Sequence, residues 1–203
     1  MNLFQMKTRP HGIERLPLFL EKGFVAIGWP GIGSLKDVDA NEIEQRLAKR
    51  YPSYVGQKMA YYKGIVNAFA NTMKAGDLVM ITEGDFVHIG QLGDYEYKQE
   101  YDNDKDGMCH QRPVHWITTV ERNALNDKVQ EHLRNRATVT KFKYPIHLAE
   151  LEPLLHGKPA PQLSDGHHSL AEKAWNVLEE ELQSNDPFVR VTAAAAILQI
   201  MKK

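Results

Sequence analysis

Residues 76–116 read GDLVMITEGDFVHIGQLGDYEYKQEYDNDKDGMCHQRPVHW, and this segment decides the fold. Apolar residues alternate with polar ones along it, which is the two-residue period of a β-strand with one buried face. Glu-Gly-Asp and Gly-Asp turns and an acidic stretch separate the apolar runs. We therefore expect four strands, at residues 77–82, 86–92, 95–101 and 112–118, joined by turns into a curved sheet.

Outside this segment the pattern adds further strands and several helices. Residues 23–29, GFVAIGW, predict a strand that ends in a Pro-Gly turn, and residues 137–143 predict a weaker one. Apolar residues at helical spacing predict helices at 39–51 and 57–74, with shorter ones at 126–135 and 146–155. Because five or six strands are enough to curl into a small barrel, we expect an α+β fold with helices beside the barrel.

The sequence changes character after residue 156. Residues 157–168 are rich in Pro, Gly and Ser and predict a linker. Beyond it, residues 169–183 and 187–202 have helix-capping patterns at their starts and together predict a helical hairpin. We therefore expect a barrel domain at 1–156, a linker at 157–168 and a hairpin at 169–203. So small a hairpin buries little surface alone, so we expect it to dock on the barrel or to mediate a homodimer or a protein contact.

Composition places the chain among soluble globular proteins. Of its 203 residues 42% are hydrophobic, and no apolar run approaches the roughly 18 residues of a membrane span. The single cysteine excludes an intramolecular disulfide, which fits a reducing compartment, and we expect a cytoplasmic protein without a membrane partner. The net charge of −1 argues against a long basic groove, but it is compatible with a local basic patch. Its candidate members are Lys7, Arg9, Lys58, Lys63 and Arg112.

The sequence gives little support to a cofactor, metal or nucleophile site. Residues 28–34, GWPGIGS, lack the spacing of a phosphate-binding glycine loop. His110 and His115 are five residues apart, which suits no metal-ligand pattern. Cys109 and His110 are adjacent, so their side chains diverge. We therefore expect no cofactor, no metal and no enzymatic activity. A small hydrolase that uses His110 or the acids near Asp94 is the weaker alternative.

Aromatic residues give the stronger functional signal. Trp29 ends one predicted strand, Tyr95 and Tyr97 lie two apart on one face of another, and Trp116 lies on a third. Rings from three strands that converge at one opening suit a flat, uncharged ring, and stacking a nucleic-acid base on a ring contributes roughly 1–3 kcal/mol. The alternative is that these rings belong to the core, above all Trp116.

At these residues the chain resembles a known group. The segments IGW, F-x3-MKAGDLVMIT, VHIGQLGDYEY and HQRPVHWI occur in the order of the PUA-like modules related to EVE and YTH domains, as found at the N-terminus of modification-dependent restriction endonucleases. The resemblance covers about residues 24–118 and extends to about 155. It implies a small bent barrel that holds a modified base, flipped from DNA or unpaired in RNA, in an aromatic cage.

The resemblance also implies site residues. It places the site at Trp29, at Tyr95 and Tyr97 of GDYEY, and on the strand HQRPVHW with His110, Arg112 and Trp116, and it implies that Arg112 holds a phosphate or seals the barrel end. We add Gly28 and Asp94 as base contacts, and Lys58 and Lys63, with Arg112 and His110, as contacts to the nucleic-acid backbone.

The chain departs from the restriction enzymes at its C-terminal part. No nuclease or motor domain follows the predicted barrel, and residues 186–201 resemble the second half of a HEAT-type repeat. We therefore expect a non-enzymatic module that binds a possibly modified base of DNA or RNA, single-stranded or flipped. The alternative is an adaptor that binds proteins through its C-terminal helices, with the aromatic residues as core.

Overall fold

The computed structural model describes residues 1–156, together with residues 181, 190–191 and 194. Met1–Lys158 forms one compact unit. The predicted linker and all but four residues of the predicted hairpin lie outside the described residues, as does the HEAT-like segment apart from three positions. In the described part of the chain, no helix has the length and apolarity needed to cross a membrane.

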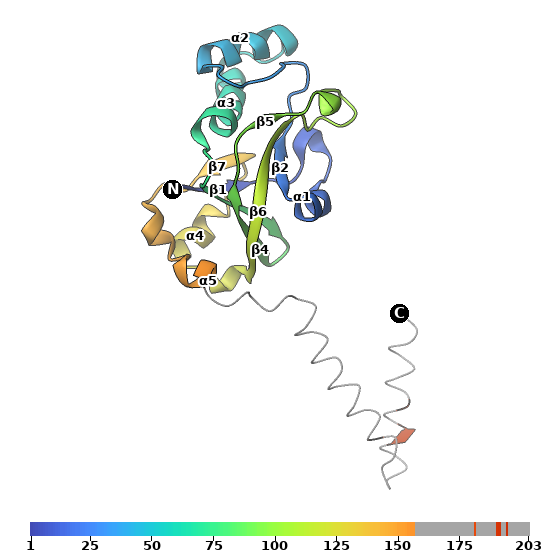
Figure 1. The fold of residues 1–203 in the computed structure, drawn as a ribbon, viewed down its shortest axis with the longest axis vertical. Coiled ribbons are helices and arrows are strands. Elements are labelled where there is room, and N and C mark those ends of the chain that lie inside the picture. The colour runs from blue at the N-terminus through green and yellow to red at the C-terminus, as the bar shows by residue number, and fades with distance from the viewer. Residues whose placement is uncertain (157–180, 182–189, 192–193, 195–203) are drawn as a thin grey trace. The chain divides into compact units, whose positions relative to one another are not determined.

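Seven strands form a single curled sheet, a half-barrel, so the fold is α+β as predicted (Figure 1). The order across the sheet is β2-β6-β4-β3-β1-β7, with β5 paired to β6. β1 and β3 are parallel, and all other pairs are antiparallel. The strands are β1 Leu3–Met6, β2 Phe24–Ile27, β3 Leu78–Glu83, β4 Phe86–Leu92, β5 Glu96–Tyr97, β6 His110–Glu121 and β7 Val139–Lys141.

The long strand β6 connects the two parts of the sheet. Its first residues pair with β2 on one side and with β5 on the other, and Arg112 lies opposite Val25. Its second half pairs with β4, with a register shift between Ile89 and Gly90. At that shift Gly90 lies opposite Trp116, so the absence of a side chain on Gly90 leaves room for the indole.

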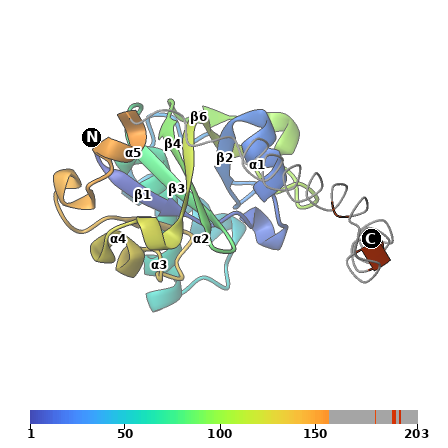
Figure 2. The same cartoon turned by 90° about the horizontal axis from the view of Figure 1, so that it is seen from below.

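Helices flank the sheet at both ends. In Figure 1, α2 (Ala40–Arg50) and α3 (Gly56–Asn67) lie at the top, whereas α4 (Asp127–His132) and α5 (Glu152–His156) lie at the bottom; Figure 2 gives the view from below. The predicted cap of α2 is present, since the Asp39 carboxylate accepts hydrogen bonds from the N–H groups of Asn41 and Glu42. α3 continues into one π-helical turn, Ala68–Thr72, where the N–H of Met73 donates to the carbonyl of Ala68.

Several predicted elements have different limits. The strand predicted at 95–101 is only Glu96–Tyr97, and a 3₁₀ turn, Gln99–Tyr101, follows it. The helix predicted at 146–155 is a 3₁₀ turn, Ile146–Ala149, separated from α5 by Glu150, which has a φ of 52°. Further 3₁₀ turns are Pro10–Gly12 and Arg122–Ala124. Two elements were not predicted, β1 and the helix α1 (Leu16–Lys22).

The core has two parts, one on each face of the sheet. Phe4, Val79 and Ile81 face a large cluster that includes residues of α1, α2 and α3. The intervening residues Leu3 and Met80 face a smaller cluster beneath α4 and α5. Because both faces of β1 and β3 are covered, both sets of side chains on these strands are buried, and the whole half-barrel is a rigid base for the loops at its end.

Candidate functional site

A hollow of about 240 Å³ lies where the loop after β2 meets the connection between α2 and α3. Four aromatic rings line it. The ring centroids of Trp29 and Tyr62 are 5.6 Å apart at an angle of 60°, and those of Tyr62 and Tyr54 are 4.5 Å apart. Tyr51 stacks on Tyr54 at 5.0 Å and 11°. We call this hollow the aromatic pocket; its other lining residues are Arg9, Pro10, His11, Gly28 and Thr138.

Two residues of the aromatic pocket have unusual backbone conformations. Trp29 has a φ of 69° and His11 a φ of 52°, both in the left-handed region that bulky residues avoid. Each such residue costs of order 1–3 kcal/mol and persists only where its surroundings enforce it. Two of the four non-glycine residues with positive φ in the described chain therefore line the same pocket. Such concentrated strain is typical of functional sites.

The loop that carries Trp29 is held by hydrogen bonds on several sides. Tyr51 donates from its hydroxyl to the carbonyl of Pro30 over 2.7 Å. The N–H of Gly31 donates to a carboxylate oxygen of Asp102 over 2.6 Å. These contacts join the loop after β2 to the end of α2 and to the loop before β6.

Tyr95 and Tyr97 lie on one face of the chain, as their spacing predicts, but they do not line the aromatic pocket. The N–H of Leu35 donates to the Tyr95 hydroxyl oxygen over 3.0 Å, and the Tyr97 hydroxyl donates to Asp102. Both rings also pack against His110. Tyr95 therefore hydrogen-bonds to the segment that follows Trp29, and Tyr97 hydrogen-bonds to the Asp102 that holds Gly31. Neither tyrosine forms a wall of the pocket with Trp29.

His110 is completely buried, so it is not placed to contact a nucleic-acid backbone as predicted. Its Nδ1 and the Tyr95 hydroxyl share a hydrogen bond of 2.8 Å. Burial lowers the pKa of His110 to about 4, against the opposing effects of the Trp29 backbone and of Asp102. The ring is therefore neutral at physiological pH, and its Nε2 has no hydrogen-bond partner in the described part of the chain.

Cys109 is also buried, next to His110. Burial, and next the Asp102 carboxylate, raise the pKa of the thiol. A thiol with a raised pKa is a poor nucleophile at neutral pH.

Arg112 lies in the interior, which corrects its placement at a nucleic-acid backbone. Its side chain is 2% exposed and donates to four carbonyls. Three of these, those of Phe69, Ala70 and Met73, end the π-helical turn, and the fourth is that of Gly93. The carbonyls at the end of a helix have no hydrogen-bond partners within the helix, and here the guanidinium of Arg112 donates to them. Burial lowers the pKa of Arg112, with Asp94 and Asp77 opposing.

The other predicted residues lie apart from one another. The Trp116 indole N–H donates to the carbonyl of Phe19 over 2.9 Å, and the ring packs on the larger core cluster. Asp94 is exposed, outside the aromatic pocket. Lys63 pairs with Glu44 at 2.7 Å. Only Lys58 approaches the pocket rings, with its Nζ 5.0 Å from the centre of the Tyr54 ring.

The rim of the aromatic pocket is cationic and its rings are neutral. Arg9 and Lys58 are exposed at the rim. Burial raises the pKa of Tyr54, although a hydrogen bond with Trp29 opposes this effect, and burial also raises the pKa of Tyr51. Neither phenol ionises near neutral pH. The pocket therefore offers π-faces and phenol hydroxyls to an uncharged flat ring, with positive charge outside for an attached anion.

Sequence reasoning missed most of the pocket. Tyr51, Tyr54 and Tyr62 line it but were not predicted, since Tyr62 fitted the buried stripe of its helix. One signal was present in the sequence: half of the eight tyrosines of the chain fall within YPSYVGQKMAYY, residues 51–62. No group of three or more His, Cys, Asp or Glu side chains suited to a metal occurs in the part of the chain that the structure describes.

Comparison with known proteins places this site within a sequence family. The model of a family described as "Domain of unknown function (DUF8426)" matches residues 16–143, which include Trp29 and all three pocket tyrosines. No curated protein matches the chain in sequence. Among solved structures, the YTH domain of the Zygosaccharomyces rouxii MRB1 protein, in complex with N6-methyladenosine RNA, is similar over 73% of this chain and 82% of that chain. Its identity of 14% and TM-score of 0.35 are too low to transfer a site or a ligand.

Proposed function

We propose that this chain, which belongs to the DUF8426 family through residues 16–143, is a non-enzymatic module that binds nucleic acid by holding one base in the aromatic pocket. The observation that supports this most is a hollow of about 240 Å³ beside the ring contact of Trp29 with Tyr62, whose centroids are 5.6 Å apart. Pockets for drug-sized ligands measure about 300–1,000 Å³. The smaller hollow suits a single heterocyclic ring, with the sugar and phosphate left outside.

The ring geometry favours a base over an aliphatic ligand. Because Trp29 and Tyr62 are inclined at 60°, a flat ligand stacks on one ring and meets the other with its edge. Thr138 and His11 line the same hollow and offer polar groups to the edge of a base. A methyl group on the base adds apolar surface that contacts these rings, so a methylated base is the finer form of the proposal.

The energetics favour a base that is already unpaired. Stacking contributes roughly 1–3 kcal/mol per base. Extrusion from a duplex costs a few kcal/mol, and least for a damaged or single-stranded base. With one pocket of this kind, the stacking gain does not clearly exceed the cost of extrusion, so we expect single-stranded DNA or RNA to bind more tightly than the matching duplex.

The proposal is tested with labelled single-stranded DNA and RNA that carry methylated, hydroxymethylated or unmodified bases, titrated by fluorescence anisotropy at low salt. Trp29→Ala and Tyr62→Ala each remove one ring wall, and we expect each to weaken binding about tenfold. Tyr61→Ala is the packing control, because Tyr61 is 49% exposed and does not line the pocket but contacts Tyr62 with ring centroids 5.3 Å apart, and we expect it to weaken binding less than Tyr62→Ala does. Binding that survives both pocket substitutions unchanged contradicts the proposal, as does the absence of binding to every probe.

A further inference from the structure

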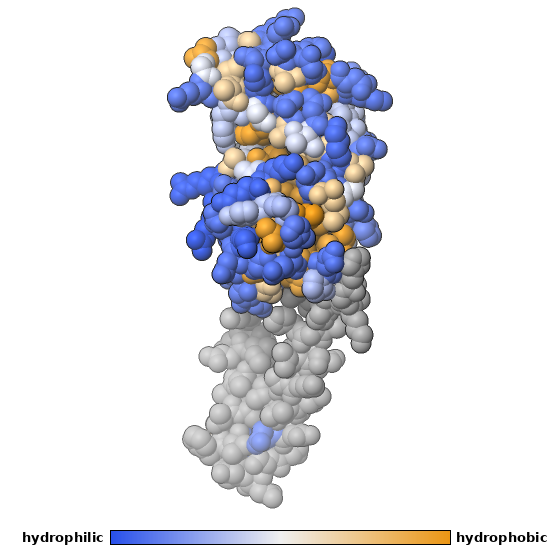
Figure 3. Space-filling model, turned by 90° about the vertical axis from the view of Figure 1, so that its left-hand side faces the viewer, coloured by the Kyte–Doolittle hydropathy of each residue, from blue (hydrophilic) through white to orange (hydrophobic). Residues whose placement is uncertain are grey.

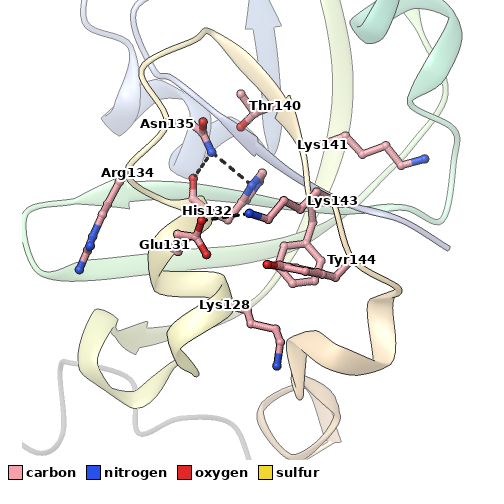
Figure 4. Close-up of a pocket in the computed structure, with 10 residues that line it drawn as sticks. Lys128, Glu131, His132, Arg134, Asn135, Thr140, Lys141, Lys143 and Tyr144 are labelled. Atoms are coloured by element: carbon pink, nitrogen blue, oxygen red, sulfur yellow. Dashed lines mark hydrogen bonds and ion pairs between the residues drawn. The ribbon is translucent and has the colours of Figure 1, made fainter.

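Two further hollows continue from the aromatic pocket toward α4 and β7. The first, of about 300 Å³, we call the basic groove; its cations are Lys7, Arg9, Arg134 and Arg136. It shares Arg9 with the aromatic pocket. The second, of about 450 Å³ between α4 and β7, shares Arg134 with the groove, and we call it the basic cavity (Figure 4). Three hollows thus follow one another, linked by shared lining residues.

Positive charge dominates both new hollows. No acidic side chain lines the basic groove in the described part of the chain. Glu131 is the one acid among the lining residues of the basic cavity, and it pairs with Lys143 at 3.0 Å. Figure 4 shows Lys143 reaching toward Glu131, while Arg134 and Lys141 extend away on opposite sides. Burial, and next the nearby Arg122, lower the pKa of Lys7, as expected where cations are crowded.

The concentration of cations around the basic groove and the basic cavity contrasts with the near-neutral charge of the whole chain. The net charge is −1, so the cations of the groove and cavity are balanced by acids elsewhere. Figure 3 shows the molecule from the side on which α4 lies in Figure 1, and hydrophilic side chains dominate the surface there. A local cationic track on a near-neutral protein attracts a polyanion at one place only.

A buried histidine in the basic cavity adds an independent observation. His132 lines the cavity and is 7% exposed, and its Nε2 has no hydrogen-bond partner among the described residues. Its Nδ1 lies 3.5 Å from the amide nitrogen of Asn135, which acts as the donor. Burial lowers the pKa of His132, with the Thr140 backbone and Glu131 opposing. A buried polar atom without a hydrogen-bond partner is unfavourable, so the wall of the basic cavity contains a polar group that the described residues leave unsatisfied.

We propose that the basic groove and basic cavity bind the sugar-phosphate backbone of the strand whose base enters the aromatic pocket. The ligand is then a polynucleotide strand of several residues rather than a free nucleoside or mononucleotide. This inference rests on the proposed function, because the shared residue Arg9 joins the phosphate track to the base pocket. An anionic membrane would engage exposed lysines over a broad face, whereas a strand follows a row of hollows.

The experiment compares chain lengths. Mixed-sequence labelled DNA and RNA single strands of about one, three, six and nine nucleotides are titrated at several salt concentrations. We expect affinity to rise at least tenfold from one to six nucleotides and log K to fall with log salt by about 0.7 per phosphate contact. Arg136→Ala with Lys141→Ala should reduce that slope by about 1.4, weaken the longer strands about tenfold and leave the mononucleotide unchanged.

The control and a second probe make the outcome decisive. Lys49→Ala with Lys74→Ala removes the same charge from two exposed lysines that line none of the three hollows, and we expect no change in slope. Equal affinity for one and nine nucleotides, or an unchanged slope in the groove variant, overturns the inference. So does binding to phosphatidylserine vesicles that exceeds strand binding and is lost in the groove variant.

The two proposals fail separately. If Trp29→Ala leaves strand binding intact while the groove variant weakens it, the base pocket is wrong and the backbone track stands. If mononucleotides bind, need Trp29 and gain nothing from added length, the base pocket stands and the track is wrong.

Discussion

Replacement of Arg112 by methionine tests how much the hydrogen bonds between β6 and the end of the α3 segment contribute to stability. The guanidinium makes hydrogen bonds of 2.7–3.1 Å to four carbonyls while almost fully buried. Each bond to a charged donor contributes about 1.5–3 kcal/mol, but burying the charge costs several kcal/mol in return. Methionine fills a similar volume and leaves the four carbonyls without this donor. We expect the free energy of unfolding to fall by about 3 kcal/mol, a large share of a typical total of about 5–15 kcal/mol.

The assay is urea unfolding followed by circular dichroism. The midpoint should shift to lower urea with an unchanged slope, since the surface exposed on unfolding stays the same. Arg134→Met provides the control, because Arg134 is exposed, and its effect should stay within about 0.5 kcal/mol. Arg112→Lys keeps the charge but not the planar fork and should lie between wild type and Arg112→Met. A loss below about 1 kcal/mol in Arg112→Met refutes the reasoning that these carbonyls depend on the guanidinium.

Three further predictions concern strain, titration and packing. Because Trp29 has a φ of 69°, Trp29→Gly should be about 1 kcal/mol more stable than Trp29→Ala in urea, although both lose strand binding; equal stabilities contradict strain at this residue. Folding holds the pKa of His110 at about 4 against an ordinary 6.5, so the unfolded chain binds more protons between these values. Stability should therefore be full above pH 6.5 and fall by roughly 3 kcal/mol as pH drops toward 4, and His110→Gln should lack this part of the pH dependence. A pH profile identical in wild type and variant counts against it. Gly90→Ala places a methyl group 2.7 Å from Trp116 and should cost about 1–3 kcal/mol, whereas Gly64→Ala on α3 meets nothing within 4 Å and should be neutral or stabilising by thermal melting.

Local pattern predicted most of the fold. The strands β3 and β4 are bounded by turns, and the helix α2 begins at a cap, and both kinds of signal are properties of neighbouring residues. β1 was not predicted, because its four residues are all buried, the polar Gln5 included, so LFQM has no alternation between buried and exposed positions to detect. Its partner strands lie far along the sequence, so only the tertiary structure reveals it.

The site was harder to predict because it depends on which distant segments meet. Trp29 and Gly28 lie at the hollow, but Tyr62 reaches it from α3, where helical spacing assigns it to the buried stripe, and Tyr54 reaches it from the connection before that helix. Arg112 illustrates the opposite error. An arginine in a strand is ordinarily exposed, and nothing local shows that a helix ends above it with carbonyls to satisfy.

Arg112 also links the two segments of the chain that carry Trp29 and Tyr62. Arg112 lies opposite Val25 in the strand that leads to Trp29, and its guanidinium holds the end of the helical segment that carries Tyr62. Both ring walls are thus tied to one residue in the middle of the sheet. A base that fits meets walls already in place, so little conformational entropy is lost when it enters.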